Sequence, residues 1–347
     1  MKQVLVSDGL REAALRPRAL VEEYVTLLDR DRRRAFGDRS GFVAVPCPGC
    51  ATEGGAPAFT KADFAYVRCS HCGSVFASPR PTADALRDFR RTSAAIRYWT
   101  SRVEAETVRD RAGSIAYPRA VWVQTTTDEA GVEPKALVDL DSKSALFIES
   151  VAQTGTFERI VLADPELDAG PLARLAGVAV EGSRATLLAR DDRVAAVSAQ
   201  ECLERDADPD RLIRDAMSLL APGGLLFLTT LTWSGFDFQV LGSRASTILP
   251  PIHLNLLSLD GIRRLLARHG FEILELSATG QLDTEIVVHA VAEDPTIDLP
   301  PFVDELIRRR DARVHRAFQQ FLQEALLSSH IRVVARRPPT AVEGDDE

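Results

Sequence analysis

The sequence predicts an α/β protein with a mainly parallel sheet that is covered by helices on both faces. The main observation is that strand-like and helix-like segments alternate between residues 135 and 292. A second observation is a stretch of different composition at residues 42–82, which is rich in proline, glycine and cysteine. The third is that Leu, Ala, Glu and Arg dominate residues 10–36, which predicts one or two helices near the start of the chain.

The chain is expected to begin with a helical segment at residues 1–41, where apolar side chains recur near helical spacing and stop before Gly37. Residues 42–82 then form a small separate unit. Residues 83–130 return to a helix-forming composition and are predicted to be a helical linker. Gly131 and Pro134 mark the start of the next unit, the main α/β domain at residues 131–297.

This domain contains seven strand-like runs, at residues 136–140, 159–164, 178–182, 193–199, 225–232, 272–278 and 285–292. Only six residues join the last two runs. Because a parallel crossover needs a longer connection, the run at 285–292 is predicted to be an antiparallel strand beside the run at 272–278.

The segment 298–336 is predicted to contain a helix and a strand. Apolar residues from Val303 to Leu326 follow the pattern of one long amphipathic helix, and the short run HIRVVA after it is a candidate strand. The acidic, proline-containing tail at residues 337–347 predicts disorder.

The bulk composition excludes several classes of protein. The net charge of −8 and a pI of about 5.4 argue against nucleic acid as the main partner. No apolar run approaches the length of about 20 residues that a membrane span needs. The first residues lack the features of a signal peptide, so we expect a cytoplasmic protein with reduced cysteines.

Four of the five cysteines form two CxxC pairs, CPGC and CSHC. The spacing C-x2-C-x18-C-x2-C is typical of a structural zinc site with four thiolate ligands, here Cys47, Cys50, Cys69 and Cys72. The alternative is a set of reduced thiols without metal. Cys202 stands alone and is expected to pack as a small apolar residue.

The stretch FAYVRCSHCGSVFASPRP resembles the zinc-ribbon leader of many bacterial class I methyltransferases that use S-adenosylmethionine. Three later stretches resemble the same family: AQECLERDADP (199–209), LLAPGGLLFLTTLT (219–232) and HLNLLSLDGIRRLLARHGFEILE (253–275). The resemblance covers roughly residues 45–335. It implies a Rossmann-like sheet of order 3-2-1-4-5-7-6 with strand seven antiparallel, in agreement with the connection argument.

The resemblance places LVDLDSKSALFIE (137–149) at the first cofactor motif, an acid followed by three spaced glycines. Asp139 matches the acid, whereas Asp141, Lys143 and Ala145 replace the glycines. Side chains there would narrow the pocket, because glycine lets the backbone approach a ligand. The charge of Asp141 would oppose the cofactor carboxylate, and Lys143 would attract an anion.

Three further residues are candidates for the site. The resemblance gives Asp164 the role of binding the ribose, but Asp164 before Pro165 equally fits a helix N-cap. His253 is a candidate general base, with a structural histidine as the alternative. Asp283 is expected to be a turn residue, and Arg205 replaces the histidine of the family's Glu-His pattern.

Three functions are compatible with these features. The first is methyl transfer from S-adenosylmethionine to a small molecule, such as a sugar or a natural-product intermediate. The second is a cofactor-deficient methyltransferase fold that acts as a scaffold for a protein partner. The third is a repurposed protein in which Lys143 holds another anionic ligand. Binding of S-adenosylmethionine would distinguish the first from the others.

Overall fold

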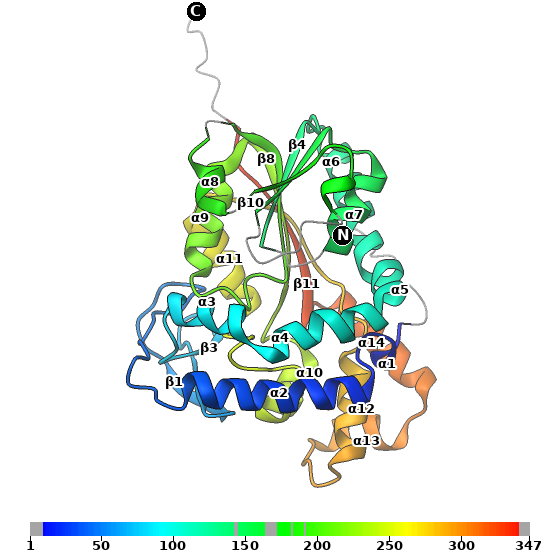
Figure 1. Cartoon of the computed structure of the whole chain (residues 1–347). Helices are drawn as coiled ribbons and strands as arrows, with labels where there is room; N and C mark the ends of the chain where they lie inside the picture. Colours follow the sequence, from blue (N-terminus) through cyan, green and yellow to red (C-terminus); the bar gives the residue numbers. More distant parts are fainter. Residues whose placement is uncertain (1–9, 142–144, 164–171, 182, 191, 340–347) are drawn as a thin grey trace, which may run out of the picture.

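The computed structural model describes residues 10–141, 145–163, 172–181, 183–190 and 192–339. These residues form two sheets, one of seven strands and one of four. Helices cover both faces of the larger sheet, and the N-terminal helices cross below it beside the smaller sheet (Figure 1).

The seven-stranded sheet confirms the predicted fold class. Its order is β10-β11-β8-β7-β4-β5-β6, which is 3-2-1-4-5-7-6 counted along the chain from the opposite edge. Five neighbouring strands are parallel, and β11 runs antiparallel to both β8 and β10. The strands are β4 (Ala136–Leu140), β5 (Arg159–Ala163), β6 (Val178–Glu181), β7 (Val194–Gln200), β8 (Leu220–Leu231), β10 (Glu272–Ala278) and β11 (His330–Arg336).

One strand of this sheet was predicted from the wrong residues. The run at 285–292 is not a strand: it belongs to helix α12 (Asp283–Glu293), outside the sheet. Its buried residues Ile286, Val287 and Val291 recur at helical spacing, which outweighs their β-branched side chains. The antiparallel position is filled by the HIRVVA segment, β11. Asp283 accordingly begins a helix rather than occupying a hairpin turn.

The two faces of the large sheet are buried by different helices. Val138 and Leu140 of β4 pack on the face covered by α8 (Arg184–Leu188), α9 (Pro209–Leu219) and α11 (Leu259–Arg268). Leu137 packs on the opposite face with α6 (Tyr117–Glu129) and α7 (Ala145–Thr154). Burial on both faces explains why the parallel strands are almost continuously apolar in sequence.

A third core joins the N-terminal helices, the small sheet and the helices that follow β8 and β10. The predicted single helix from Val303 to Leu326 is two helices in this region, because Asp311 caps a new one through the backbone N–H groups of Arg313 and Val314. The helices are α1 (Glu12–Leu15), α2 (Arg18–Phe36), α3 (Ala83–Thr92), α4 (Ala94–Tyr98), α5 (Val108–Arg111), α10 (Phe236–Leu241), α12, α13 (Pro301–Arg309) and α14 (Ala312–Glu324). Two π-helical segments, Trp99–Glu104 and Ala112–Ala116, connect α4, α5 and α6.

The small sheet is antiparallel and combines distant parts of the chain. Its strands are β1 (Ala56–Lys61), β2 (Phe64–Arg68), β3 (Val75–Ala77) and β9 (Asn255–Leu256). Because β9 follows β8 in the chain, the cysteine-rich unit is built into the rest of the molecule. None of the described helices is long and apolar enough to cross a membrane.

Candidate functional site

The four predicted cysteines come together in one cluster. The Sγ atoms of Cys47, Cys50, Cys69 and Cys72 all lie within 4.8 Å of one another. Each CxxC pair forms a tight turn: Ala51 N–H donates to the Cys47 carbonyl, and Gly73 N–H donates to the Cys69 carbonyl. Gly73 has a φ of 74°, a conformation that glycine adopts without strain.

The donor set fits a zinc ion. Zn–S bonds of about 2.3 Å in a tetrahedron require sulfur atoms about 3.8 Å apart. The Cys47–Cys72 and Cys50–Cys69 Sγ distances are both 3.5 Å, close to that requirement. His71 is exposed and outside the cluster, so four thiolates alone would close the coordination shell.

The cysteine cluster is packed against helix α11. Ser258, the N-cap of α11, donates its backbone N–H to Ser74 Oγ at 3.0 Å and its hydroxyl to the Cys72 carbonyl. A side chain on Gly261 would place Cβ 2.1 Å from Ser74 Oγ and 3.4 Å from Cys72 Sγ. The absence of a side chain at Gly261 therefore lets the ribbon contact the α/β domain directly.

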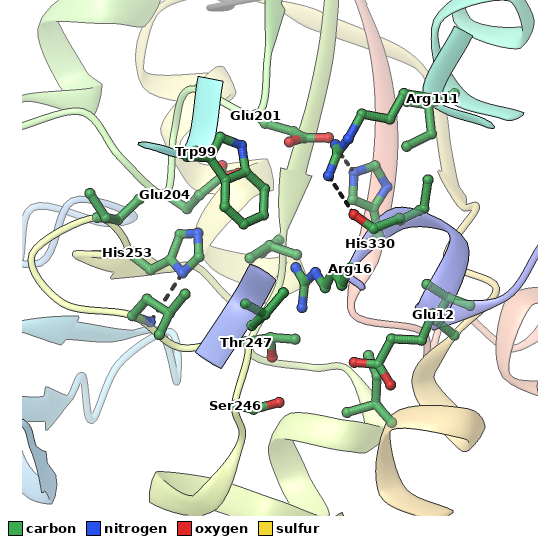
Figure 2. Close-up of a pocket in the computed structure, with 18 of the residues that line it drawn as sticks. Glu12, Arg16, Trp99, Arg111, Glu201, Glu204, Ser246, Thr247, His253 and His330 are labelled. Carbon is green, nitrogen blue, oxygen red and sulfur yellow. Dashed lines mark hydrogen bonds and ion pairs between the residues drawn. The ribbon is translucent and has the colours of Figure 1, made fainter. Parts of the chain in front are cut away.

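A cavity of about 2090 Å³ lies where the strands of the large sheet end at their carboxyl termini. Residues after β4 and β7, such as Asp141 and Glu201, line one part of it. Helices α1, α2, α4 and α5 and the segment after α10 line the opposite part. Figure 2 shows Glu12, Arg16, Trp99, Arg111 and His253 among its walls.

The residue directly after β4 has a backbone conformation typical of glycine. Asp141 has a φ of 62°, in the left-handed region that L-residues avoid. Both Asp141 and Ala145, the first residue of α7, line the cavity. Asp139 is fully buried, accepts a hydrogen bond from Ser198 and does not belong to the cavity wall. Lys143 and Asp164 lie outside the described residues.

Glu201 provides a carboxylate inside the cavity. It follows β7 with a φ of 55°, and 42% of its side chain is accessible. Arg119 Nη2 lies 2.5 Å from its Oε1, and His330 Nε2 lies 3.5 Å from the same atom. Burial favours the protonated acid, but Arg119 and His330 hold the pKa of Glu201 well below its ordinary value. Glu201 is therefore ionised and available to accept hydrogen bonds.

His253 lines the same cavity, as a candidate catalytic residue should. Its Nδ1 accepts the backbone N–H of Leu249 at 3.2 Å (Figure 2). Burial, together with the charges of Arg16 and Arg205, lowers the pKa of His253 to about 3. The ring is therefore neutral at pH 7 and a weak proton acceptor, which makes it a poor general base in this state. Its catalytic role stays a prediction.

Two more residues of the AQECLER stretch lie near His253, of which Glu204 is buried and Arg205 is half-buried. Burial raises the pKa of Glu204 to about 7, and its Oε2 accepts a hydrogen bond from Thr230 Oγ1 at 2.8 Å. Arg205 donates to the backbone carbonyls of Gln200 and Glu201. The arginine that replaces the family's histidine thus fixes the turn that follows β7.

Sequence reasoning did not find Arg16, Arg119, Glu201 or His330. Glu201 could have been found from its position directly after the fourth strand, where parallel sheets bind ligands. His330 could have been found only if the HIRVVA segment had been predicted to be the antiparallel strand of the large sheet. Arg16 and Arg119 carry no local signal, because only the packing of the N-terminal helices on the sheet brings them to the cavity.

Residues 114–276 match a family model described as "Methyltransferase domain". None of the curated proteins matches the sequence. The match begins in the helices before β4 and ends within β10, so it includes most of the large sheet.

Solved structures with similar folds include a putative sarcosine dimethylglycine methyltransferase from Galdieria sulphuraria. It is 14% identical, with a TM-score of 0.44, over 68% of this chain and 88% of that one. A putative methyltransferase solved with the Haloferax volcanii Trm112 activator is 16% identical, with a TM-score of 0.45, over 69% of this chain and 96% of that one. Because both TM-scores are low, the strand order of the chain itself carries the fold assignment.

Proposed function

Since residues 114–276 match the family model for a methyltransferase domain, we propose that the chain binds S-adenosylmethionine and methylates a small molecule within the cavity. The cofactor would lie against the loops after β4 and β7. The acceptor would lie under the N-terminal helices. When bound, S-adenosylmethionine supplies an electrophilic methyl group.

The observation that carries this proposal is the size and position of the cavity. Pockets for single ligands usually measure about 300–1,000 Å³. At about 2090 Å³ this cavity has room for a cofactor and an acceptor together. It lies at the carboxyl ends of parallel strands, where open α/β sheets bind their ligands.

The residues of the chain would act mainly by binding and orientation. Glu201 is held ionised by Arg119 and His330, so it would accept hydrogen bonds from an ammonium or hydroxyl group. The helices α2, α4 and α5 would exclude water from the reacting groups. Holding two reactants in one orientation supplies much of what methyl transfer needs from a protein.

We also propose that Cys47, Cys50, Cys69 and Cys72 hold a structural zinc ion. Four thiolates leave no open coordination position, so the ion would stabilise the ribbon and take no part in the reaction. Its contribution would be to fold the unit on which α11 and β9 are packed.

Calorimetry with S-adenosylhomocysteine tests the cofactor site. One molecule should bind per chain, and Ala145→Phe should abolish binding by filling the wall at the start of α7. Gln153→Phe adds the same side chain to an exposed position of the same helix and should leave binding unchanged. Equal affinity of the Ala145→Phe variant and the native protein would contradict this placement.

The second candidate is a methyltransferase-like scaffold that has lost its cofactor. It is favoured by one observation, that Asp141 and Ala145 carry side chains in the cavity wall where the family has glycine. No binding of S-adenosylhomocysteine at millimolar concentration would support it.

A further inference from the structure

An arginine without a hydrogen-bond or ion-pair partner among the described residues lies in the wall of the cavity. Arg16 connects α1 to α2 and is half-buried. Its guanidinium makes no hydrogen bond or ion pair with any of the residues that the structure describes. Figure 2 shows this side chain among the residues that line the cavity. A guanidinium inside a cavity is normally paired, because burial of an isolated charge is costly.

A second arginine is fixed beside it. Arg111 donates from Nη2 to the carbonyl of Leu15 at 2.8 Å and from Nε to Thr107 Oγ1 at 2.8 Å. Its guanidinium lies over the Trp99 ring, 5.4 Å from the centroid. The bond to Leu15 ties Arg111 to the residue that precedes Arg16. Burial, and to a smaller extent the positive charge of Arg16, lower the pKa of Arg111.

The carboxylates near Arg111 have other partners than Arg16. Arg16 and Arg119 act on Arg111 as cations, and Glu104 and Glu201 act on it as anions. The carboxylate of Glu201 is already paired with Arg119, and that of Glu104 accepts a hydrogen bond from Trp99, so neither is paired with Arg16. A ligand with a negative charge would complete the set, because guanidinium groups bind carboxylate and phosphate in a planar, two-point geometry.

Arg16 lies away from the loop predicted to hold the cofactor. It lies between α1 and α2 on the helical side of the cavity, whereas Asp141 follows β4 at the carboxyl edge of the large sheet.

We propose that Arg16 and Arg111 bind an anionic group of the acceptor, a phosphate or a carboxylate, on the helical side of the cavity. That the anion belongs to the methyl acceptor rests on the proposed function, but the anion site itself does not depend on it. Thr247, which is 4% exposed, lines the cavity, and its hydroxyl lacks a hydrogen-bond partner among the described residues. It would provide a further donor.

Binding of inorganic pyrophosphate, measured by calorimetry on the full chain saturated with S-adenosylhomocysteine, tests the proposal. The native protein should bind it, with an affinity that falls as salt concentration rises. Arg16→Gln should weaken binding at least about tenfold, equivalent to about 1.4 kcal/mol. Arg16→Lys should retain part of the affinity. Because Arg16 makes no hydrogen bond or ion pair within the described part of the chain, its variants should melt at the native temperature.

Arg18→Gln is the matched control, since Arg18 lies two residues away and is paired with Glu22 at 2.8 Å and Glu293 at 3.3 Å. It should bind pyrophosphate as the native protein does. Equal binding by the Arg16→Gln variant, or none by the native protein, would overturn the proposal. If the protein binds pyrophosphate alone but not when it is saturated with S-adenosylhomocysteine, the two ligands compete. The site would then belong to the cofactor carboxylate. If S-adenosylhomocysteine does not bind but pyrophosphate does, the proposed function fails and the anion site stands.

Discussion

Replacing Asp141 by glycine should strengthen the binding of S-adenosylmethionine. Asp141 has a φ of 62° at the first position where the family resemblance expects glycine, so the substitution suits the backbone already present. It also removes a carboxylate from the cavity wall beside the predicted position of the cofactor carboxylate.

Two effects set the magnitude, and they act on different measurements. The first effect concerns the stability of the fold. An L-residue in the left-handed conformation costs about 1–2 kcal/mol, which glycine would recover, but the extra freedom of glycine in the unfolded chain offsets about 0.5–1 kcal/mol of this recovery. The second effect concerns ligand affinity. The carboxylates of Asp141 and of the cofactor, if about 7 Å apart, would repel by about 2 kcal/mol at an effective dielectric constant of about 20. Because Arg184 and Arg205 already offset part of the charge of Asp141, we expect a gain in affinity of about tenfold.

Asp63→Gly is the control for the backbone effect. Asp63 has a φ of 65° in the turn between β1 and β2, away from the cavity wall, and 68% of its side chain is accessible. Both variants should change thermal stability by a small amount. Of the two, only Asp141→Gly should change the affinity for S-adenosylmethionine measured by calorimetry. A triple variant with glycine at 141, 143 and 145 should bind S-adenosylmethionine more tightly still.

Either of two results would refute this reasoning. Unchanged or weaker affinity in the Asp141→Gly variant would mean that the aspartate does not oppose the ligand. Equal gains in the Asp63→Gly variant would mean that the effect arises from global stability. No binding even with all three glycines would favour the scaffold function.

Further predictions concern the ribbon and a buried acid. Metal analysis should find about one zinc per chain, and Cys72→Ser should lower both zinc content and stability, whereas a folded, metal-free protein with titratable thiols would contradict the zinc site. Gly261→Ala should destabilise the protein by about 1–3 kcal/mol through its contact with Ser74, while Gly113→Ala, with no atom within 4 Å of the new Cβ, should be nearly neutral; equal melting temperatures would contradict the packing argument. The pKa of Glu204 is raised to about 7 in the folded protein, so its contribution to stability is present below about pH 4.5 and is lost as the pH rises through 7, by about 3 kcal/mol in all. Glu204→Gln should flatten this loss in denaturation midpoints measured from pH 5 to 8, and an unchanged slope would show that Glu204 is not responsible.

The large sheet could be predicted from the sequence because its parallel strands are buried on both faces and read as apolar runs. The same logic failed at residues 285–292, where β-branched residues in a helix also form an apolar run. A run of eight residues does not distinguish a strand from a helix by composition, and the helical spacing of Ile286, Val287 and Val291 was the decisive feature.

The candidate site was less predictable, because its residues are distant in sequence. The cysteine cluster was found because CxxC spacing is set by local turn geometry. Arg119 and Glu201 are 82 residues apart, and only the packing of α6 beside β7 brings them together. The positive φ of Asp141 could not be read from its side chain, since aspartate occurs in the left-handed region as well as in the ordinary backbone regions.

The ribbon and the cavity are connected through one buried side chain. Asn255 of β9 is fully buried, accepts a hydrogen bond from Arg80 Nη1 at 2.6 Å and donates to the carbonyls of Leu203 and Asp206 at 2.8 Å each. It therefore ties the ribbon to the turn that carries Glu204.

Asn255→Ala should accordingly do more than destabilise the fold. Removing the amide takes a hydrogen bond from two carbonyls and one of two from Arg80, which still donates to the carbonyl of Ala207. Each carbonyl that stays buried without a partner costs about 1–3 kcal/mol. If the ribbon positions the turn after β7, the variant should keep its zinc but bind S-adenosylhomocysteine more weakly, measured well below its melting temperature. Unchanged affinity in a destabilised but zinc-loaded variant would show that the ribbon only supports the fold. A loss of affinity would mean that the cysteine cluster and the cavity form one functional unit, although no cysteine lines the cavity except Cys202 among the described residues.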